Sequence, residues 1–140
     1  MSKIDVWLDF NTDIMWQLDI EDKLFTWYEA NEYVAQFNKV KYGGFDNWRL
    51  PTIGELEQVN GYKNLDIAWK YKEKNIDTKN FLKAFFWSAT LLKDNMEKAY
   101  SISPGIDPSQ KAWNININTR ATGYDDLSDR QSVRLCRNTL

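Results

Sequence analysis

The chain has 140 residues, of which 43% are hydrophobic and 27% charged, and this length predicts one domain over residues 1–140 that buries about two thirds of its unfolded surface. A net charge of -2 and a pI near 5.2 argue against a nucleic-acid binder, and the lack of an apolar run of about 18 residues argues against membrane insertion. With no histidine and Cys136 as its single cysteine, the sequence excludes a histidine-activated nucleophile, a structural zinc site and an internal disulfide.

The N-terminal part predicts a β-hairpin followed by a helix. Residues 6–10 and 14–18 alternate as strands do, and the polar residues 11–13 between them favour a tight turn. Thr26 and Glu29 form a T-x-x-E capping box that opens a helix, and two glycines lie beyond its end. The apolar residues of this helix recur at helical spacing: Trp27, Ala30, Tyr33, Val34 and Phe37.

The sequence FDNWRLPTIGELEQV at 45–59 predicts a buried corner that leads into a second helix. Thr52 and Glu55 form another capping box, so this helix is expected to begin near Ile53 and to end at the Asn-Gly pair after residue 59. Pro51 holds the preceding residue in an extended conformation. Alternation before the proline therefore predicts Trp48 and Leu50 on one side and Arg49 on the other.

Short strands return in the second half of the chain. Within 62–83 the pattern favours a helix over 64–74 and a loop over 75–80. The apolar run 85–90 is typical of a central strand, and 98–103 is the next predicted strand.

The C-terminal part predicts two further strands separated by polar loops. The breaker-rich segment 104–110 is expected to be a loop. Residues 112–118 alternate between apolar and asparagine side chains, which predicts a strand. A loop over 119–130 and a last strand over 132–137 complete the expected order.

Six motifs occur in order along almost the whole chain: DIMWQ (13–17), FTWYEA (25–30), DNWRLPTIGEL (46–56), FWSAT (86–90), AWNINI (112–117) and VRLCR (133–137). Together they resemble the C-terminal domain family of the Legionella collagen-like protein. This resemblance implies an α+β, C-type lectin-like fold. Two helices would pack on a small, mostly antiparallel twisted sheet, the N- and C-terminal strands would pair, and a long loop region would display the binding surface.

The chain departs from that family at its cysteines. Members often carry one cysteine in the first helix and one in the terminal VRCVR motif, and the corresponding residues here are Val34 and Leu135. Cys136 lies one position later and would face the other side of a strand. The RLPT-x-x-E element also resembles the formylglycine-generating branch of this fold, but that branch uses cysteine chemistry that one cysteine cannot supply.

The asparagines of the 112–118 strand are the first candidate ligand-binding residues. Asn114, Asn116 and Asn118 point away from the apolar side chains, and three amides in a row would offer donors and acceptors to a polar ligand. The alternative is that they form only the solvated side of an antiparallel strand.

The following loop adds candidates for the same ligand surface. Arg120 and Tyr124 belong to residue types that are enriched in recognition surfaces, and Asp125 and Asp126 add negative charge beside them. A polar loop is equally typical of plain solvent exposure, and the sequence leaves both interpretations open.

No metal and no cofactor is predicted. Asp107, Asp125, Asp126 and Asp129 offer the oxygen ligands that Ca²⁺ prefers. Calcium-dependent sugar binding in C-type lectins uses an EPN- or QPD-like tripeptide before a WND-like strand, and DPSQKAWN at 107–114 lacks that tripeptide.

The other conspicuous charged residues are interpreted as structural. Arg49 and Arg134 next to apolar neighbours are more typical of loop-holding hydrogen bonds than of ligand contacts. Glu29 and Glu55 belong to capping boxes, which disfavours a role as an acid–base pair. The expected structural motif comprises Trp48, Arg49, Pro51, Thr52, Glu55 and Trp87.

The sequence thus predicts a non-enzymatic module that binds a polar ligand, a polysaccharide or a protein surface, through the C-terminal strand and loop region. The acidic balance weakens a sulfated polysaccharide as ligand. The alternatives are a retroelement-diversified variable receptor, suggested by the composition of 114–129, a structural or assembly domain of a fibre, and a hydrolase with paired carboxylates; homo-oligomerisation stays open. The start MSKIDVWLDF lacks signal-peptide features, so the chain as written is expected in the cytoplasm, although the resembled family is often secreted or on the cell surface.

Overall fold

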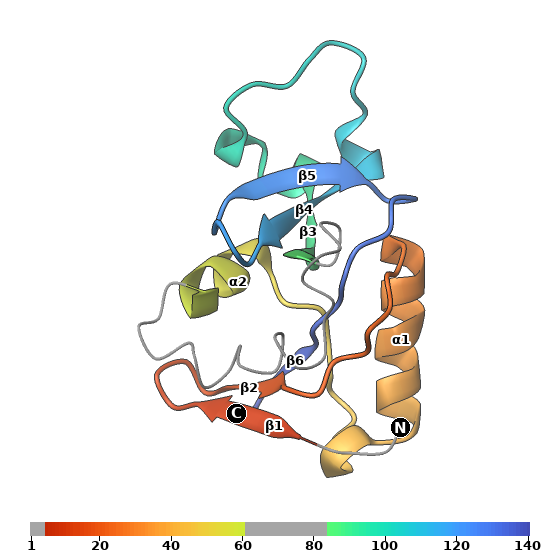
Figure 1. The fold of residues 1–140 in the computed structure, drawn as a ribbon, viewed down its shortest axis with the longest axis vertical. Coiled ribbons are helices and arrows are strands. Elements are labelled where there is room, and N and C mark those ends of the chain that lie inside the picture. Colours follow the sequence, from red (N-terminus) through yellow and green to blue (C-terminus); the bar gives the residue numbers. More distant parts are fainter. Residues whose placement is uncertain (1–4, 61–83) are drawn as a thin grey trace.

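The computed structural model describes residues 5–60 and 84–140, and Figure 1 shows the arrangement of their helices and strands. One three-stranded sheet lies in the lower half of that view and a second in the upper half, with helix α1 along one side and helix α2 on the other. The predicted helix at 64–74 and loop at 75–80 lie outside the described residues.

The first sheet joins the two ends of the chain. Strands β1 (Val6–Asp9) and β2 (Ile14–Gln17) form the predicted antiparallel hairpin, and β2 also pairs with β6 (Cys136–Asn138), so the strand order is β1-β2-β6. Asp13 closes the hairpin turn at φ 58°, a left-handed conformation that aspartate tolerates better than most residues. The expected pairing of N- and C-terminal strands is therefore confirmed.

Helix α1 (Trp27–Lys39) begins where its capping box predicts. The Thr26 hydroxyl accepts from the Glu29 N–H at 3.1 Å, and the Glu29 carboxylate accepts from the Thr26 N–H at 3.0 Å. Ala30 and Phe37 on its apolar stripe are buried. The helix is followed by a short 3-10 turn, η1 (Tyr42–Gly44).

Helix α2 (Ile53–Asn60) begins at the second predicted capping box. The Thr52 hydroxyl accepts from the Glu55 N–H at 3.2 Å, and the Glu55 carboxylate accepts from the Thr52 N–H at 2.8 Å. This helix packs against β3 and β4 of the second sheet, where Leu56 is fully buried.

The second sheet consists of β3 (Phe85–Leu91), β4 (Lys111–Asn116) and β5 (Thr122–Asp126), all antiparallel in the order β3-β4-β5. The two sheets replace the single sheet that the resemblance implied. They are joined by the segment that leads into β6, because Ser132 bridges to Phe86 of β3 before the chain reaches the first sheet.

Two apolar clusters form the core, one on each side of the second sheet. The first lies between both sheets and α2, and it includes Trp16, Leu56, Phe86, Trp113 and Cys136. The second lies between the other face of the second sheet and α1. Val34 and Leu135, at the family's cysteine positions, both belong to the second cluster, so apolar packing is present where the family often has a disulfide.

Three predicted elements near the C-terminus were wrong in place or type. Residues 98–103 form no strand, because their backbone follows a 3-10 turn and pairs with no neighbouring strand. The predicted loop at 119–130 contains β5, since antiparallel pairing with β4 outweighs the low strand propensity of glycine and aspartate. The last strand was predicted at 132–137, whereas β6 begins at Cys136 and the residues before it make only isolated bridges.

Candidate functional site

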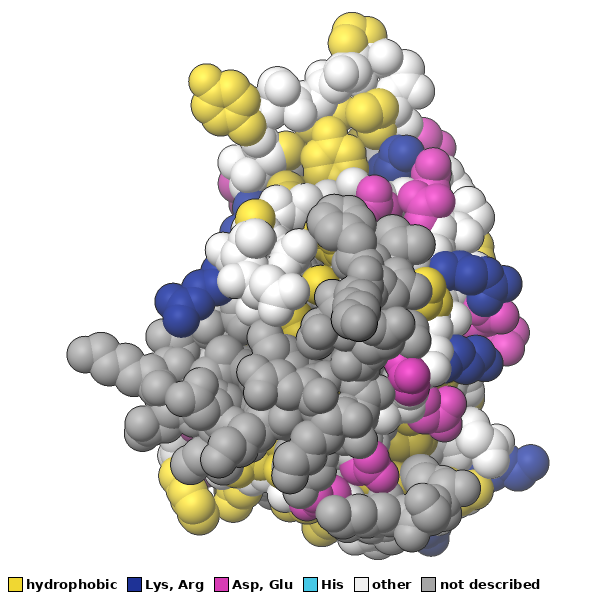
Figure 2. Space-filling view, in the orientation of Figure 1, with side chains coloured by type: hydrophobic (Ala, Val, Ile, Leu, Met, Phe, Trp, Pro, Cys, Tyr) yellow, Lys and Arg dark blue, Asp and Glu magenta, His cyan; other side chains and the backbone are white. Residues whose placement is uncertain are grey.

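A long loop between β3 and β4 projects beyond the second sheet at the upper end of the molecule (Figure 1). It contains three short 3-10 turns, η3 (Leu92–Asp94), η4 (Met96–Lys98) and η5 (Pro108–Gln110). Leu92 is fully buried at its start, whereas Tyr100 is 106% exposed, which means that its side chain packs on nothing. Apolar groups also lie on the outer surface of this end in Figure 2.

The loop is anchored on the face of the second sheet that carries Trp113 and Tyr124. Tyr124 of β5 packs edge-to-face on Trp113 of β4 with ring centroids 5.5 Å apart, and its hydroxyl donates to the Ser101 carbonyl at 3.5 Å. Lys98 forms an ion pair with Glu57 of α2 at 2.6 Å. Three side chains of the loop are partly buried and pack against the first apolar cluster: Ala99, Ile102 and Ile106.

The expected row of exposed amides on β4 does not form, because Asn114 and Asn116 are only 1% and 7% exposed. Gln131, in the segment that leads into β6 (the covering segment), reaches over the face that carries them, and the next residue, Ser132, pairs with Phe86 of β3. Asn114 Nδ2 donates to Asp125 Oδ2 at 2.6 Å, and Gln131 of the covering segment donates to the same oxygen at 2.6 Å. The structure thus corrects the assumption, common to both interpretations, that these two amides face solvent.

Asn116 organises the turn between β4 and β5. Its Oδ1 accepts from the backbone N–H of Asn118 at 2.9 Å and of Thr119 at 3.2 Å. The turn places Asn118 and Arg120 at the surface, with Arg120 at φ 67°. The side chain of Asn116 therefore does not face solvent. It holds the backbone of the turn on which Asn118 and Arg120 are exposed.

The acidic residues of β5 are engaged within the chain. Asp126 is exposed and pairs with Lys111 across the two strands at 2.7 Å, and this hydrogen bond raises the pKa of Lys111. Asp107 caps η5 by accepting from the Ser109 N–H at 3.0 Å and its hydroxyl at 2.7 Å. Within residues 5–60 and 84–140, no set of three or more acidic or cysteine side chains gathers as a metal site.

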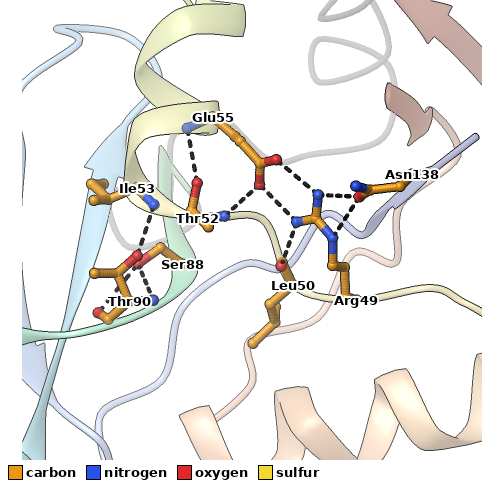
Figure 3. A network of polar contacts seen from close by, with 8 residues as sticks. All are labelled: Arg49, Leu50, Thr52, Ile53, Glu55, Ser88, Thr90 and Asn138. Atoms are coloured by element: carbon orange, nitrogen blue, oxygen red, sulfur yellow. Dashed lines mark hydrogen bonds and ion pairs between the residues drawn. The ribbon is translucent and has the colours of Figure 1, made fainter. Parts of the chain in front are cut away.

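Arg49, Thr52 and Glu55 of the predicted structural motif lie at the joint between the sheets and α2 (Figure 3). Arg49 binds both carboxylate oxygens of Glu55, at 2.7 and 2.8 Å, and also donates to Asn138 Oδ1 in β6 at 3.0 Å. Burial acts to raise the pKa of Glu55, but hydrogen bonds from Arg49 and from the Thr52 N–H outweigh it and hold that pKa below its usual value.

The two tryptophans of that motif are buried and hydrogen-bonded. The Trp48 indole N–H donates to the Tyr42 carbonyl at 2.9 Å, and the Trp87 indole N–H donates to the Phe25 carbonyl at 2.8 Å. Pro51 is buried beside the joint, and its carbonyl accepts from the Ala89 N–H of β3 at 2.7 Å. The motif therefore connects α1, α2 and both sheets.

Sequence reasoning did not identify Tyr100 as a candidate, because the residue lies within the segment that was predicted as a strand. One signal favoured a surface loop: the breaker-rich sequence PGIDPSQ at 104–110, which follows soon after Tyr100. The structure brings Tyr100 close to the predicted candidate Tyr124, through Ser101. Asn118 and Arg120 lie at the turn that precedes β5.

Comparisons with known proteins identify the fold and the family. Two solved structures resemble this chain. The snake venom toxin convulxin is 12% identical with a TM-score of 0.57, and the match covers 97% of this chain and 96% of that chain. Rhodocetin, described in complex with the integrin alpha2-A domain with strontium, is 13% identical with a TM-score of 0.50, and the match covers 91% of this chain and 92% of that chain. Both are C-type lectin-like proteins, and they show that the present fold is C-type lectin-like.

The search of curated proteins found no match. None of the helices in the described part of the chain has the length and apolar character that crossing a membrane requires. A model of the Lcl C-terminal domain matches residues 5–137, nearly the whole chain. The chain therefore belongs to the Lcl C-terminal domain family.

Proposed function

We propose that this chain is a non-enzymatic recognition module that binds a polar ligand, a carbohydrate or a protein surface, through the loop between β3 and β4 and the turn between β4 and β5. One observation carries the proposal. Tyr100 is wholly exposed on a loop that is packed onto the sheet on both sides of it, by Leu92 before and Ile106 after. Exposing an aromatic ring has no benefit for folding, whereas a tyrosine on an anchored loop offers a large contact area at a small entropic cost.

The predicted site residues have distinct parts in this proposal. Asn118, Arg120 and Asp126 are exposed and would contact the ligand, and Tyr124 would form the floor between them and Tyr100. Asn114, Asn116 and Asp125 would act indirectly, because their side chains hold the β4–β5 turn and the covering segment in place. Asp125 accepts hydrogen bonds from Asn114 and from Gln131 of the covering segment, and Asn116 accepts two within the turn.

The carboxylates support a binding role over an enzymatic one. Glu29 accepts from the Thr26 N–H and pairs with Arg130 at 2.6 Å, and Glu55 is bound by Arg49 and the Thr52 N–H. Each carboxylate therefore caps its own helix and forms an ion pair with its own arginine. Neither is arranged as the general acid or base of a shared site.

A glycan and protein array probed with the purified chain tests this proposal. For any ligand recovered, Tyr100→Ala and Arg120→Ala are expected to weaken binding at least about tenfold, because exposed aromatic and arginine side chains dominate recognition surfaces. Tyr28→Ala is the matched control, since Tyr28 is also an exposed tyrosine but lies on α1. Unchanged binding by both loop variants would reject the site.

The variable-receptor alternative draws support from one feature of the same region. Residues 118–121 and 128–130 are exposed, whereas Asn114, Asn116 and the covering segment at 131–135 are buried. Diversification would then be confined to the exposed positions. The surrounding DNA tests this alternative, which requires a near-copy of the coding segment for residues 114–129.

A further inference from the structure

The projecting loop carries two exposed carboxylates and two exposed apolar side chains within residues 94–100. We call Asp94, Met96, Glu97 and Tyr100 the crest. Met96 is 42% exposed and Tyr100 is fully exposed, and the two carboxylates beside them are exposed. Neither Asp94 nor Glu97 makes an ion pair within residues 5–60 and 84–140. The crest thus combines apolar surface with unpaired negative charge.

The two lysines near the crest do not neutralise it. Lys98 is turned toward the sheet, where it pairs with Glu57 at 2.6 Å and lies 5.9 Å from the centroid of the Trp113 ring. Lys93 is exposed beside Asp94 in the sequence and adds one positive charge against the two carboxylates, Asp94 and Glu97. The crest therefore keeps a net negative charge.

A second exposed apolar patch with the opposite charge lies where α1 ends. We call Lys39, Val40, Lys41 and Phe45 the base. Val40 is 51% exposed and Phe45 is 36% exposed, and both lysines are exposed without an ion pair in the described part of the chain. The guanidinium of the buried Arg137 stacks on the Phe45 ring at 3.6 Å from its centroid.

The charge of the base is positive even when its acidic neighbour is included. Three cations, Lys39, Lys41 and Arg137, meet one carboxylate, Asp46, which follows Phe45 in the sequence. The Arg137 guanidinium lies against the Phe45 ring, so the exposed aromatic surface is next to a positive charge.

The crest lies in the upper half of the molecule, beside the second sheet, and the base lies at the lower end. In Figure 1 the loop after β3 forms the upper end, and the end of α1 with η1 forms the lower end on the same side as α1. A single molecule therefore cannot bring the two patches together. Two molecules placed end to end can do so.

We propose that the crest of one molecule binds the base of a second copy of this chain, so that molecules associate head to tail. This inference rests on the proposed recognition role of the loop and names its partner. Met96 and Tyr100 would pack against Val40 and Phe45, and the crest carboxylates would face Lys39 and Lys41. Crest-to-crest contact is disfavoured because it brings carboxylates together.

This geometry makes definite predictions about the assembly. The contact is heterologous, so each added molecule exposes a new free end, and growth continues as an open chain unless the rotation closes a ring. Each patch is small, which places the interface at the low end of the size range of specific complexes, below about 1,200 Å². Association is therefore expected at concentrations of about 10 µM to 1 mM and is expected to weaken at high salt.

Analytical ultracentrifugation of the purified chain tests the inference. The wild type is expected to show an average mass that rises with concentration and falls between about 0.02 and 0.5 M salt. A base variant, Lys39→Glu with Lys41→Glu, and a crest variant, Asp94→Lys with Glu97→Lys, are each expected to associate at least about tenfold more weakly, because like charges then face each other. An equimolar mixture of the two variants is expected to associate again, because each supplies the end that complements the other.

Controls separate this result from misfolding and from nonspecific charge effects. All four altered positions are exposed, so thermal unfolding of both variants is expected to match that of the wild type. Glu32→Lys on the exposed surface of α1 changes charge away from both patches and is expected to associate like the wild type. Tyr100→Ser keeps every charge and is expected to weaken association.

Each opposing outcome has a clear meaning. A wild type that stays monomeric over the whole concentration range overturns the head-to-tail inference. Charge variants that associate as strongly as the wild type overturn it too. If Tyr100→Ala nevertheless loses an array ligand, the proposed recognition function stands with another partner. Restored association in the variant mixture without any array ligand supports self-recognition and rejects an external ligand for the loop.

Discussion

The joint at residues 48–55 and the crest both combine an aromatic side chain with charged neighbours, but the structure uses them in opposite ways. In the joint, Trp48 is buried, and Arg49 is bound by Glu55 and Asn138. In the crest, Tyr100 is exposed, and the nearby carboxylates make no ion pair in the described residues. An aromatic residue beside a charge is therefore structural where its polar partners lie inside the molecule, and a candidate for recognition where they do not.

The largest expected effect is on the joint. Trp48→Ala should lower the free energy of unfolding by about 3–5 kcal/mol, because it removes a buried ring and leaves a cavity. That ring contacts Phe37 and Tyr42, with centroids 5.8 and 5.6 Å away, and it donates to the Tyr42 carbonyl. Urea denaturation measures the change. A loss below about 1 kcal/mol would show that the joint is not a main support of the fold.

Arg49→Ala should lower the free energy of unfolding by about 1–3 kcal/mol, because it leaves the partly buried Glu55 without its bidentate partner. The side chains of Arg49 and Glu55 are 33% and 20% exposed, which limits the loss. Arg130→Ala breaks the more exposed pair with Glu29 and should cost less. If Arg49→Ala keeps the stability of the wild type but loses ligand binding, Arg49 is a ligand-binding residue and not a structural one.

Asn114→Ala tests whether the predicted amide is structural. We expect a loss of about 1–3 kcal/mol in the free energy of unfolding, because Asp125 loses the hydrogen bond from a buried amide. Asn118→Ala at the exposed turn should cost less. If Asn114→Ala leaves stability unchanged and abolishes binding, the residue contacts the ligand after all.

The joint should also be sensitive to acid. The pKa of Glu55 in the folded chain is lowered below its usual value of 4.5, so the ionised form stabilises the fold. This contribution is present above pH 4.5 and is lost as the pH falls through the lowered pKa. Denaturation curves recorded between neutral and acidic pH should therefore show a steeper loss for the wild type than for Glu55→Gln. Parallel losses would mean that other carboxylates dominate acid unfolding.

The smallest expected effect on stability is at the crest. Tyr100→Ala should leave the unfolding curve unchanged, because the side chain packs on nothing, and should still weaken recognition. Thermal unfolding and the array or ultracentrifugation assays, run on the same preparation, measure both quantities. A destabilised Tyr100→Ala variant would show that the loop depends on this ring and would remove the contrast with the joint.

Local signals predicted the first half of the fold well. Both capping boxes, the Asp13 turn and the buried side of the Trp48 corner follow from hydrogen bonds and sterics between residues close in sequence, and the structure contains them all. The family resemblance predicted the C-type lectin-like fold, which the comparisons show. The roles of the individual ligand-binding residues stay predictions.

The wrong predictions concern features that depend on contacts between residues distant in the sequence. The 98–103 segment has a strand-like pattern but no partner strand, so its apolar residues pack as a loop. The β5 sequence TGYDD has low strand propensity, yet it pairs with β4. Asn114 and Asn116 alternate with apolar residues as exposed side chains do, but the segment at 131–133 covers their face, and alternation within one strand carries no information about what covers it.

By itself, the sequence determined where the helices begin, which hairpin forms and to which family the chain belongs, because these depend on short-range hydrogen bonds, backbone sterics and ordered motifs. Only the tertiary structure decided which polar and aromatic residues face solvent. Burial depends on the segments that pack across a face, and these come from distant parts of the chain: Gln131 covers Asn114, whereas no described segment covers Tyr100. The candidate site therefore includes the β3–β4 loop, in which the sequence pattern had predicted a strand at residues 98–103.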